Sequence, residues 1–254
     1  MATGGIVGGI IGNQIGGRQG SIVGVLIGTA IGGVIGYEIG RSLNEQDRKV
    51  AYQKFALGMN SGQTGQRHSW TTPDKTAVAN YTPLASTSRT AKARLVRPSN
   101  VVAPSELEVI AAPHRTPRSV NIRSIPAATG QQVGKLEKGE EVMVVGKVVG
   151  QPWYLLSRNN TTLGYVSADL MGPAGGEVPG ATLLVASDDA NAMPMPSAGM
   201  EASDIPIRTT CRDMTYEIVK DGSMAENGTF GGCKQIDGNW VIGPAGQAQQ
   251  ASAG

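Results

Sequence analysis

Glycine stands at every fourth position over the first forty residues of the chain. The period has no gap and comprises Gly4, Gly8, Gly12, Gly16, Gly20, Gly24, Gly28, Gly32, Gly36 and Gly40. A glycine inside a water-exposed helix costs about 1 kcal/mol relative to alanine, so this run is not expected to fold alone in water. The residues between the glycines are mainly Ile, Val and Leu, whereas a flexible linker would carry polar residues there. In lipid the backbone must satisfy its own hydrogen bonds, which forces an apolar run into a helix.

The glycine run divides into two segments around a turn. Residues 16–21 place a charge and three glycines between two apolar stretches. The second stretch, residues 21–40, would make a helix roughly 30 Å long, which is enough to cross a bilayer. Glycines four residues apart form a flat stripe on such a helix and let two backbones approach closely. We therefore expect a glycine-zipper transmembrane α-hairpin over residues 3–41 that self-associates into a homo-oligomer. The alternative is a low-complexity tail that aggregates or stays disordered.

Composition excludes several classes of protein. Aromatic residues make up only 4% of the 254 residues, which argues against one large core. A formal charge of +2 argues against a dedicated nucleic-acid binder. The two cysteines, Cys211 and Cys233, have too few further ligands near them in sequence for a metal site, and no cofactor motif is present. A disulfide in an oxidising envelope compartment is the simplest use of these cysteines, and two unpaired thiols are the alternative.

Segments of different composition follow the glycine run. Residues 42–84 hold an amphipathic helix, with Ser42 and Glu45 spaced as a capping box, and then a short strand around Trp70. We expect this helix to lie at the membrane surface. Residues 85–118, basic and rich in Ser, Thr, Pro and Ala, and residues 172–206 are expected to be long disordered linkers, the first of them either merely solvated or weakly attracted to anionic lipid or cell-wall polymer. Residues 244–254 are expected to be a disordered tail.

Residues 119–171 alternate in hydrophobicity over five short runs separated by turn residues, which predicts a small all-β barrel. The segment resembles a bacterial Src-homology-three-like domain. The residues that carry the resemblance are Asn121, Arg123, Gly134, Leu136, Gly139, Trp153, Tyr154, Gly164, Tyr165 and Val166. The resemblance implies binding to cell-wall peptides or protein partners and no catalysis. Trp153 and Tyr165 are the candidate residues of a ligand groove, and the alternative is that both rings belong to the core.

Residues 207–243 predict a small antiparallel β-meander. Met214, Tyr216 and Ile218 alternate with polar or smaller residues, and Asp-Gly pairs at residues 221–222 and 237–238 are hairpin turns. Phe230, Cys233 and Trp240 are expected to face inward. A Cys211–Cys233 bridge would stabilise so small a sheet by about 3 kcal/mol.

The order of these motifs is similar to that of the rickettsial surface-antigen lipoproteins. In that family a glycine-zipper hairpin leads into a short helix, a tryptophan strand and a two-cysteine module. The matching residues are Asn44, Glu45, Asp47, Arg48, Ala51, Trp70, Pro73, Asp74, Cys211, Arg212, Cys233, Gly238 and Trp240. The sequence differs from the family by the absence of a lipobox cysteine and by the barrel, which we interpret as an insertion between two parts of one small sheet.

These features predict a non-enzymatic protein of the bacterial cell envelope, with the outer membrane favoured. Its domains would contact peptidoglycan or envelope proteins from the periplasm or the surface, and no nucleic acid. Cys211 or Cys233 with His68 or His114 is the one available nucleophile–base set, and a disulfide would remove it. An oligomeric membrane pore is the alternative function, with Asn13, Gln14 and Arg18 lining a polar path.

Overall fold

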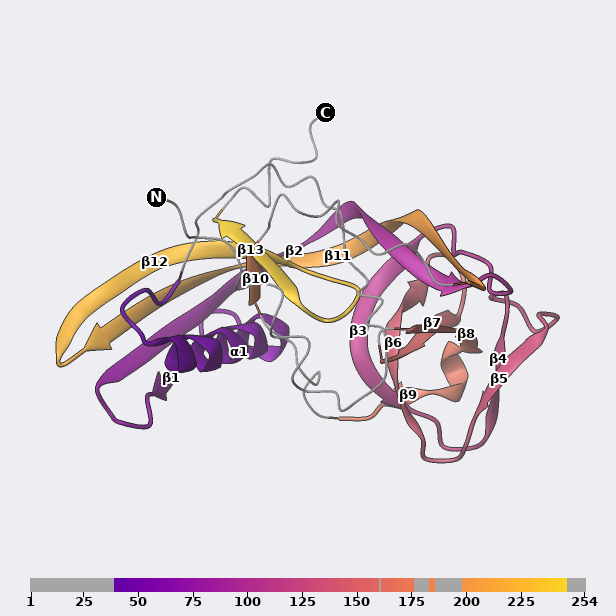
Figure 1. Cartoon of the computed structure of the whole chain (residues 1–254), viewed down its shortest axis with the longest axis horizontal. Coiled ribbons are helices and arrows are strands. Elements are labelled where there is room, and N and C mark those ends of the chain that lie inside the picture. The colour runs from indigo at the N-terminus through magenta and orange to yellow at the C-terminus, as the bar shows by residue number, and fades with distance from the viewer. Residues whose placement is uncertain (1–38, 160, 176–182, 186–197, 246–254) are drawn as a thin grey trace.

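The computed structural model describes residues 39–159, 161–175, 183–185 and 198–245 (Figure 1). Within these residues there are one α-helix, one 3-10 turn and a sheet of thirteen strands. The glycine zipper over residues 3–38, together with Asn13, Gln14 and Arg18 of the pore alternative, lies outside the described residues, and so does most of the predicted tail. Both predicted linkers fall partly inside the described chain.

The two parts of the predicted antigen module form one sheet, as expected. Strand β1 (His68–Thr71) pairs with β2 (Ala77–Pro98), and β2 pairs with β11 (Met200–Lys220). β11 pairs in turn with β12 (Ser223–Lys234), and β12 pairs with β13 (Trp240–Pro244). The short β10 (Leu183–Val185) runs parallel to β13. The two Asp-Gly hairpin turns and the inward positions of Phe230, Cys233 and Trp240 are confirmed.

Helix α1 (Glu45–Ser61) covers one face of this sheet. We call α1 and this sheet the antigen-like module, after the resemblance that predicted it. Ala51, Phe55 and Met59 recur at helical spacing and are buried against Tyr81, Tyr216, Phe230 and Trp240 of the strands. The apolar stripe from which we predicted a helix on the membrane surface is therefore buried against the sheet and is not available to lipid. The predicted capping box is wrong: Asn44 is the N-cap, and its side chain accepts from the Asp47 amide at 2.8 Å.

The predicted linkers contain the longest strands of the protein. Residues 85–98 form the second half of β2, and residues 200–206 form the start of β11. The two strands pair antiparallel along their whole length, from Met200 opposite Pro98 to Lys220 opposite Ala77. The linker interpretation is thus wrong for both stretches, because two polar sequences about a hundred residues apart satisfy each other's backbone hydrogen bonds. We call this pair of strands the ribbon.

The barrel lies at the opposite end of the ribbon from the β11–β12 turn (Figure 1). Six strands follow one another in the order β3, β6, β7, β8, β4, β5, all antiparallel. Their bounds are β3 Leu107–Arg115, β4 Val120–Arg123, β5 Gln132–Leu136, β6 Glu141–Val148, β7 Trp153–Arg158 and β8 Thr161–Ser167. The 3-10 turn Ala168–Leu170 and β9 (Gly172–Pro173) close the unit. The predicted barrel is present, but β3 extends it into the predicted linker.

The barrel and the ribbon share a hydrophobic core. Val145, Leu155 and Tyr165 from the barrel pack in one buried cluster with residues of the ribbon, namely Ala93, Leu95, Ile205 and Ile207. β3 also pairs directly with β11, through Ile207 opposite Leu107. The inserted barrel is therefore built onto the ribbon and does not hang from flexible tethers.

Candidate functional site

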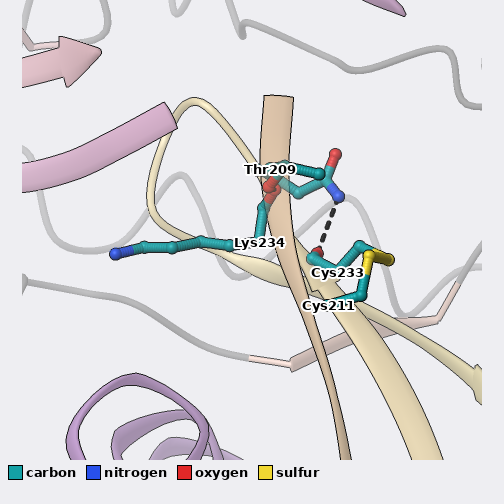
Figure 2. Close-up of a disulfide and its surroundings, with 5 residues drawn as sticks. Thr209, Cys211, Cys233 and Lys234 are labelled. Atoms are coloured by element: carbon teal, nitrogen blue, oxygen red, sulfur yellow. Dashed lines mark hydrogen bonds between the residues drawn. A yellow bond between two sulfur atoms is a disulfide. The ribbon is translucent and has the colours of Figure 1, made fainter. Parts of the chain in front are cut away.

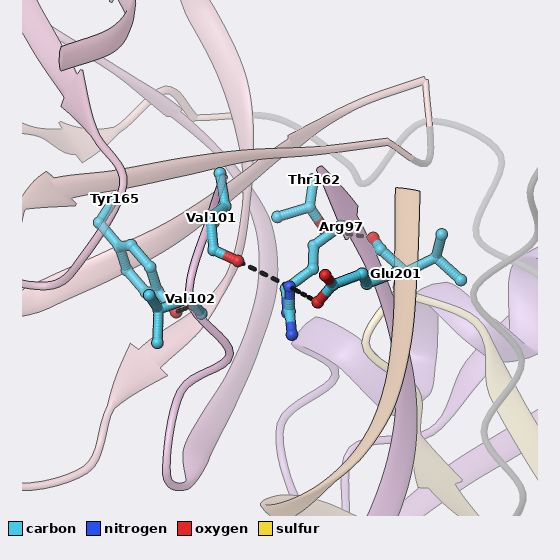
Figure 3. Close-up of polar contacts among 7 residues, drawn as sticks. Arg97, Val101, Val102, Thr162, Tyr165 and Glu201 are labelled. Carbon is cyan, nitrogen blue, oxygen red and sulfur yellow. Dashed lines mark hydrogen bonds and ion pairs between the residues drawn. The ribbon is translucent and has the colours of Figure 1, made fainter. Parts of the chain in front are cut away.

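The junction of the barrel with the ribbon is where the predicted ligand-groove residues lie (Figure 3). Tyr165 of β8 is fully buried, and its hydroxyl donates to the carbonyl of Val102 at 2.7 Å. Burial raises the pKa of the Tyr165 hydroxyl far above its ordinary value. The ring is thus a core residue whose one polar atom is already satisfied. Its predicted place in a ligand groove is wrong, and the alternative interpretation, a core ring, is correct for Tyr165.

Two further polar contacts hold the same junction. The Thr162 hydroxyl donates to the carbonyl of Val96 at 2.8 Å, so β8 is bonded to the edge of β2. Arg97 donates from one guanidinium nitrogen to the Val101 carbonyl at 2.8 Å and to Glu201 at 2.9 Å (Figure 3). The side chain of Arg97 is only 11% exposed, so this ion pair is screened by water less than a surface pair. These bonds fix the turn at the end of the ribbon against the barrel.

Trp153, the second candidate, has a different environment. It begins β7, is half-buried and packs against the junction cluster. Part of its indole thus stays accessible to a ligand, while Tyr165 does not. The two rings do not form one exposed aromatic surface. The sequence could not separate them, because the partner of Tyr165 is a turn residue of a segment without strand periodicity.

The disulfide joins β11 of the ribbon to its neighbour β12 (Figure 2). Cys211 of β11 and Cys233 of β12 are directly opposite in the ladder and are bonded, which confirms the predicted pairing. Both cysteines are buried. Gln235 donates from its side-chain nitrogen to the Cys233 carbonyl at 2.8 Å, and Thr209 donates to the Lys234 carbonyl. The bridge therefore joins the strands just before β12 leaves the ribbon.

Two matches to protein families agree with this arrangement. Residues 118–171 match the family model described as the bacterial SH3 domain. Residues 2–40 match the one described as the glycine zipper 2TM domain. The chain thus contains one segment similar to the glycine zipper 2TM domain and one similar to the bacterial SH3 domain. The predicted combination of a glycine zipper with a Src-homology-three-like domain is confirmed. Because of this similarity we call the barrel the SH3 domain below. No curated protein and no solved structure matches the chain. Among the residues with described structure, no helix has the length and apolar character to cross a membrane.

The SH3 domain has a shallow cleft of about 410 Å³ beside its closing turn. Asp169 and Leu170 of the 3-10 turn line it together with Arg115 and Pro117. Arg115 already donates to Glu141 at 2.9 Å and to the Ala174 carbonyl at 3.0 Å. The lining of the cleft combines one cation, one carboxylate and apolar side chains. Of these residues the sequence had indicated only Arg115, as one of the basic residues of the predicted linker.

Both histidines pack against tyrosine rings in the described structure. His68 stacks on the ring of Tyr81 with 5.2 Å between centroids. His114 is buried, lies edge-on to Tyr154 and has Nδ1 3.2 Å from the Ala112 carbonyl oxygen. Both cysteines are consumed by the disulfide. The described part of the chain contains no group of three or more His, Cys, Asp or Glu residues placed to hold a metal ion.

Arg212 of β11 is a buried cation of the antigen-like module. It follows Cys211 and is 9% exposed. Its Nε donates to the Leu84 carbonyl at 2.8 Å, and Nη1 donates to the carbonyls of Gly58 and Met59 at 3.3 and 3.2 Å. Nη2 donates to the Thr64 hydroxyl at 3.1 Å. Gly58 and Met59 are in the last turn of α1, so Arg212 caps the negative end of the helix and ties it to the ribbon.

Lys234 is a half-buried cation at the contact between β12 and the SH3 domain. Its ammonium donates to the carbonyl of Ile110 in β3 at 2.8 Å. Desolvation lowers the pKa of Lys234 to about 8. This value is below the unfolded value of about 10.4, so between pH 8 and pH 10.4 the unfolded chain binds more protons than the folded one. Stability contributed by this site must therefore rise with pH across that window.

We expect the Lys234→Met variant to lack this rise. Relative to the variant, the wild-type free energy of unfolding should increase between pH 8 and pH 10. Only the wild type has the Lys234 ammonium, which loses its proton at lower pH in the folded chain than in the unfolded chain. Urea unfolding at pH 7, 8.5 and 10 measures the difference. Lys147→Met, at an exposed lysine of β6, is the matched control and should keep a constant offset from wild type. A constant offset for Lys234→Met as well would show that Lys234 is not desolvated.

Proposed function

We propose that the protein is a non-enzymatic component of the bacterial cell envelope, with the outer membrane favoured. The glycine zipper anchors it in the membrane and associates with zippers of further copies. The SH3 domain, fixed to the antigen-like module by the ribbon, binds peptidoglycan or envelope proteins. The match to the bacterial SH3 domain supports the binding role, and the match to the glycine zipper 2TM domain supports the anchor.

The observation that carries the proposal is the rigid connection between the two modules. The ribbon is 21 residues long in β11, which at about 3.3 Å per residue gives a length on the order of 65 Å. It is held at the junction by a buried cluster, near its middle by the disulfide, and at the other end by α1 and the sheet. A rigid spacer of this kind is useful to a protein that must hold a binding domain at a set distance from its anchor.

Trp153 is the ligand-contacting residue that the structure leaves accessible. Its indole is half-buried and so offers a fixed apolar surface with little loss of side-chain entropy on binding. We expect the full-length protein, solubilised in mild detergent, to sediment with purified peptidoglycan sacculi. Trp153→Ala should weaken this retention. Trp70→Ala is the matched control, because Trp70 is also half-buried but belongs to the antigen-like module.

The same preparation tests the anchor. Wild-type protein should fractionate with membranes and give crosslinked oligomers there. Gly28→Leu should remove the oligomers because a bulky side chain separates the helices, whereas Ile27→Leu should leave them. Soluble wild-type protein would contradict the anchor, and unaltered oligomers in Gly28→Leu would contradict zipper association. If folded, membrane-bound protein does not sediment with sacculi, peptidoglycan is excluded as the ligand and envelope proteins remain as the proposed partners.

A further inference from the structure

The end of the glycine zipper is built into the folded module. The family match extends to residue 40, and the described structure begins at residue 39. Ile39 is fully buried in the core formed by α1 and the sheet. The amide of Gly40 donates to Glu226 of β12 at 2.9 Å. The last residues matched by the zipper family are therefore core residues of the module, with no linker between the two.

Two more contacts fix the same segment to the hairpin of β11 and β12. The ammonium of Lys220 donates to the Ser42 carbonyl at 3.1 Å. The Glu226 oxygen that accepts from Gly40 also accepts from the Tyr216 hydroxyl at 2.9 Å. Leu43 is buried beside them. Residues 39–43 thus lie against the part of the hairpin next to its turn, at the opposite end of the ribbon from the SH3 domain (Figure 1).

Two turns meet at this end of the sheet and form what we call the tip surface, residues 73–76 and 220–225. The Asp221 amide donates to the Thr76 carbonyl at 2.8 Å, so the turns form one unit. Lys75 and Lys220 are exposed there, with Asp74 and Asp221 beside them. Met224 is 54% exposed and is one of two large hydrophobic side chains so exposed in the described chain. The surface thus carries two lysines and two carboxylates, whose formal charges cancel, beside an exposed apolar side chain.

We propose that the tip surface faces the bilayer and contacts phospholipid headgroups, while the ribbon holds the SH3 domain away from the membrane. The inference rests on the proposed membrane anchor. Residues between the last membrane-embedded position and Ile39 span at most about 3.5 Å each, so the buried segment at residues 39–43 keeps this end of the sheet close to the bilayer. Lysine ammonium groups are attracted to lipid phosphates, and the thioether of Met224 suits the boundary between headgroups and acyl chains.

Depth-dependent quenching tests the orientation in full-length protein reconstituted into phosphatidylglycerol–phosphatidylethanolamine vesicles. A cysteine is introduced at Ser223 in the tip surface or at Lys138 in an exposed turn of the SH3 domain, and is labelled with a fluorophore without reductant, so that the native disulfide stays closed. Headgroup-spin-labelled lipid should quench the probe at position 223 strongly and the probe at position 138 little. A ten-residue Gly/Ser insertion between Glu38 and Ile39, on the zipper side of the buried segment, should abolish the difference.

Equal quenching at the two positions, or stronger quenching at 138, would overturn the orientation while leaving the anchor intact. A quenching difference that survives the insertion would contradict the role of the buried segment at residues 39–43. Protein that fails to enter vesicles would overturn the proposed anchor, and with it this inference. The three outcomes are distinct because vesicle flotation is scored before quenching is read.

Discussion

Replacing Arg212 with alanine should destabilise the antigen-like module by about 3 kcal/mol. The change removes the Arg212 donor from the carbonyls of Leu84 and Met59 in a buried site, while the Gly58 carbonyl keeps its bond from the Gly62 amide at 2.9 Å. A buried acceptor left without a partner costs about 1–3 kcal/mol, and some of these will recover a bond to water. Arg212→Lys should recover only part of the loss, because one ammonium cannot reach acceptors that a planar guanidinium spans. Urea unfolding followed by circular dichroism measures both variants.

Arg208 supplies the control for this prediction. It lies four residues earlier on the same strand, but its side chain is 50% exposed and pairs with Glu106 at 2.8 Å. Exposed ion pairs contribute about 0–1 kcal/mol, so Arg208→Ala should be nearly neutral. Similar losses in Arg208→Ala and Arg212→Ala would show that capping of α1 is not what Arg212 does. The burial of Arg212 also lowers the pKa of its guanidinium, in keeping with a desolvated site.

The elements that could be predicted from the sequence are those with local signals. The alternation of Met214, Tyr216 and Ile218, together with the Asp-Gly turns, specifies a hairpin with one buried face, and the structure has it. The disulfide follows from two cysteines that the ladder places opposite each other. The SH3 pattern is also local, since its turn glycines and strand residues lie within about fifty positions.

The ribbon could not be predicted because its signal is not local. Residues 85–92 are mostly exposed in the described structure, so they carry no alternation of apolar and polar residues. They form a strand because their backbone pairs with β11, a strand far along the chain. From composition alone, such a stretch is predicted to be a linker. The N-cap was misplaced although its signal is local: the Asn44 side chain accepts from the Asp47 amide, and Asn is as favourable an N-cap as Ser.

The role of Tyr165 depends on the same non-local pairing. The sequence places its ring in the SH3 pattern, where a core position and a groove position look alike. Folding the ribbon packs Leu95 and Ile207 in one buried cluster with the ring and places the Val102 carbonyl at its hydroxyl, so Tyr165 is a core residue. If the SH3 domain folded without the ribbon, its residues of this cluster would be exposed to water. The domain and the ribbon are therefore expected to unfold together.

Tyr165→Ala should destabilise that shared unit by about 4 kcal/mol, because truncating a fully buried aromatic ring removes its burial and leaves a cavity. Tyr165→Phe should cost about 1 kcal/mol, since it removes only the bond to Val102. Thermal unfolding and limited proteolysis of the full-length variants measure these effects. In Tyr165→Ala, cleavage should increase in the SH3 domain and in residues 85–98 together. Cleavage confined to the SH3 domain, with the ribbon still protected, would show that the two fold separately and that the junction cluster does not couple them.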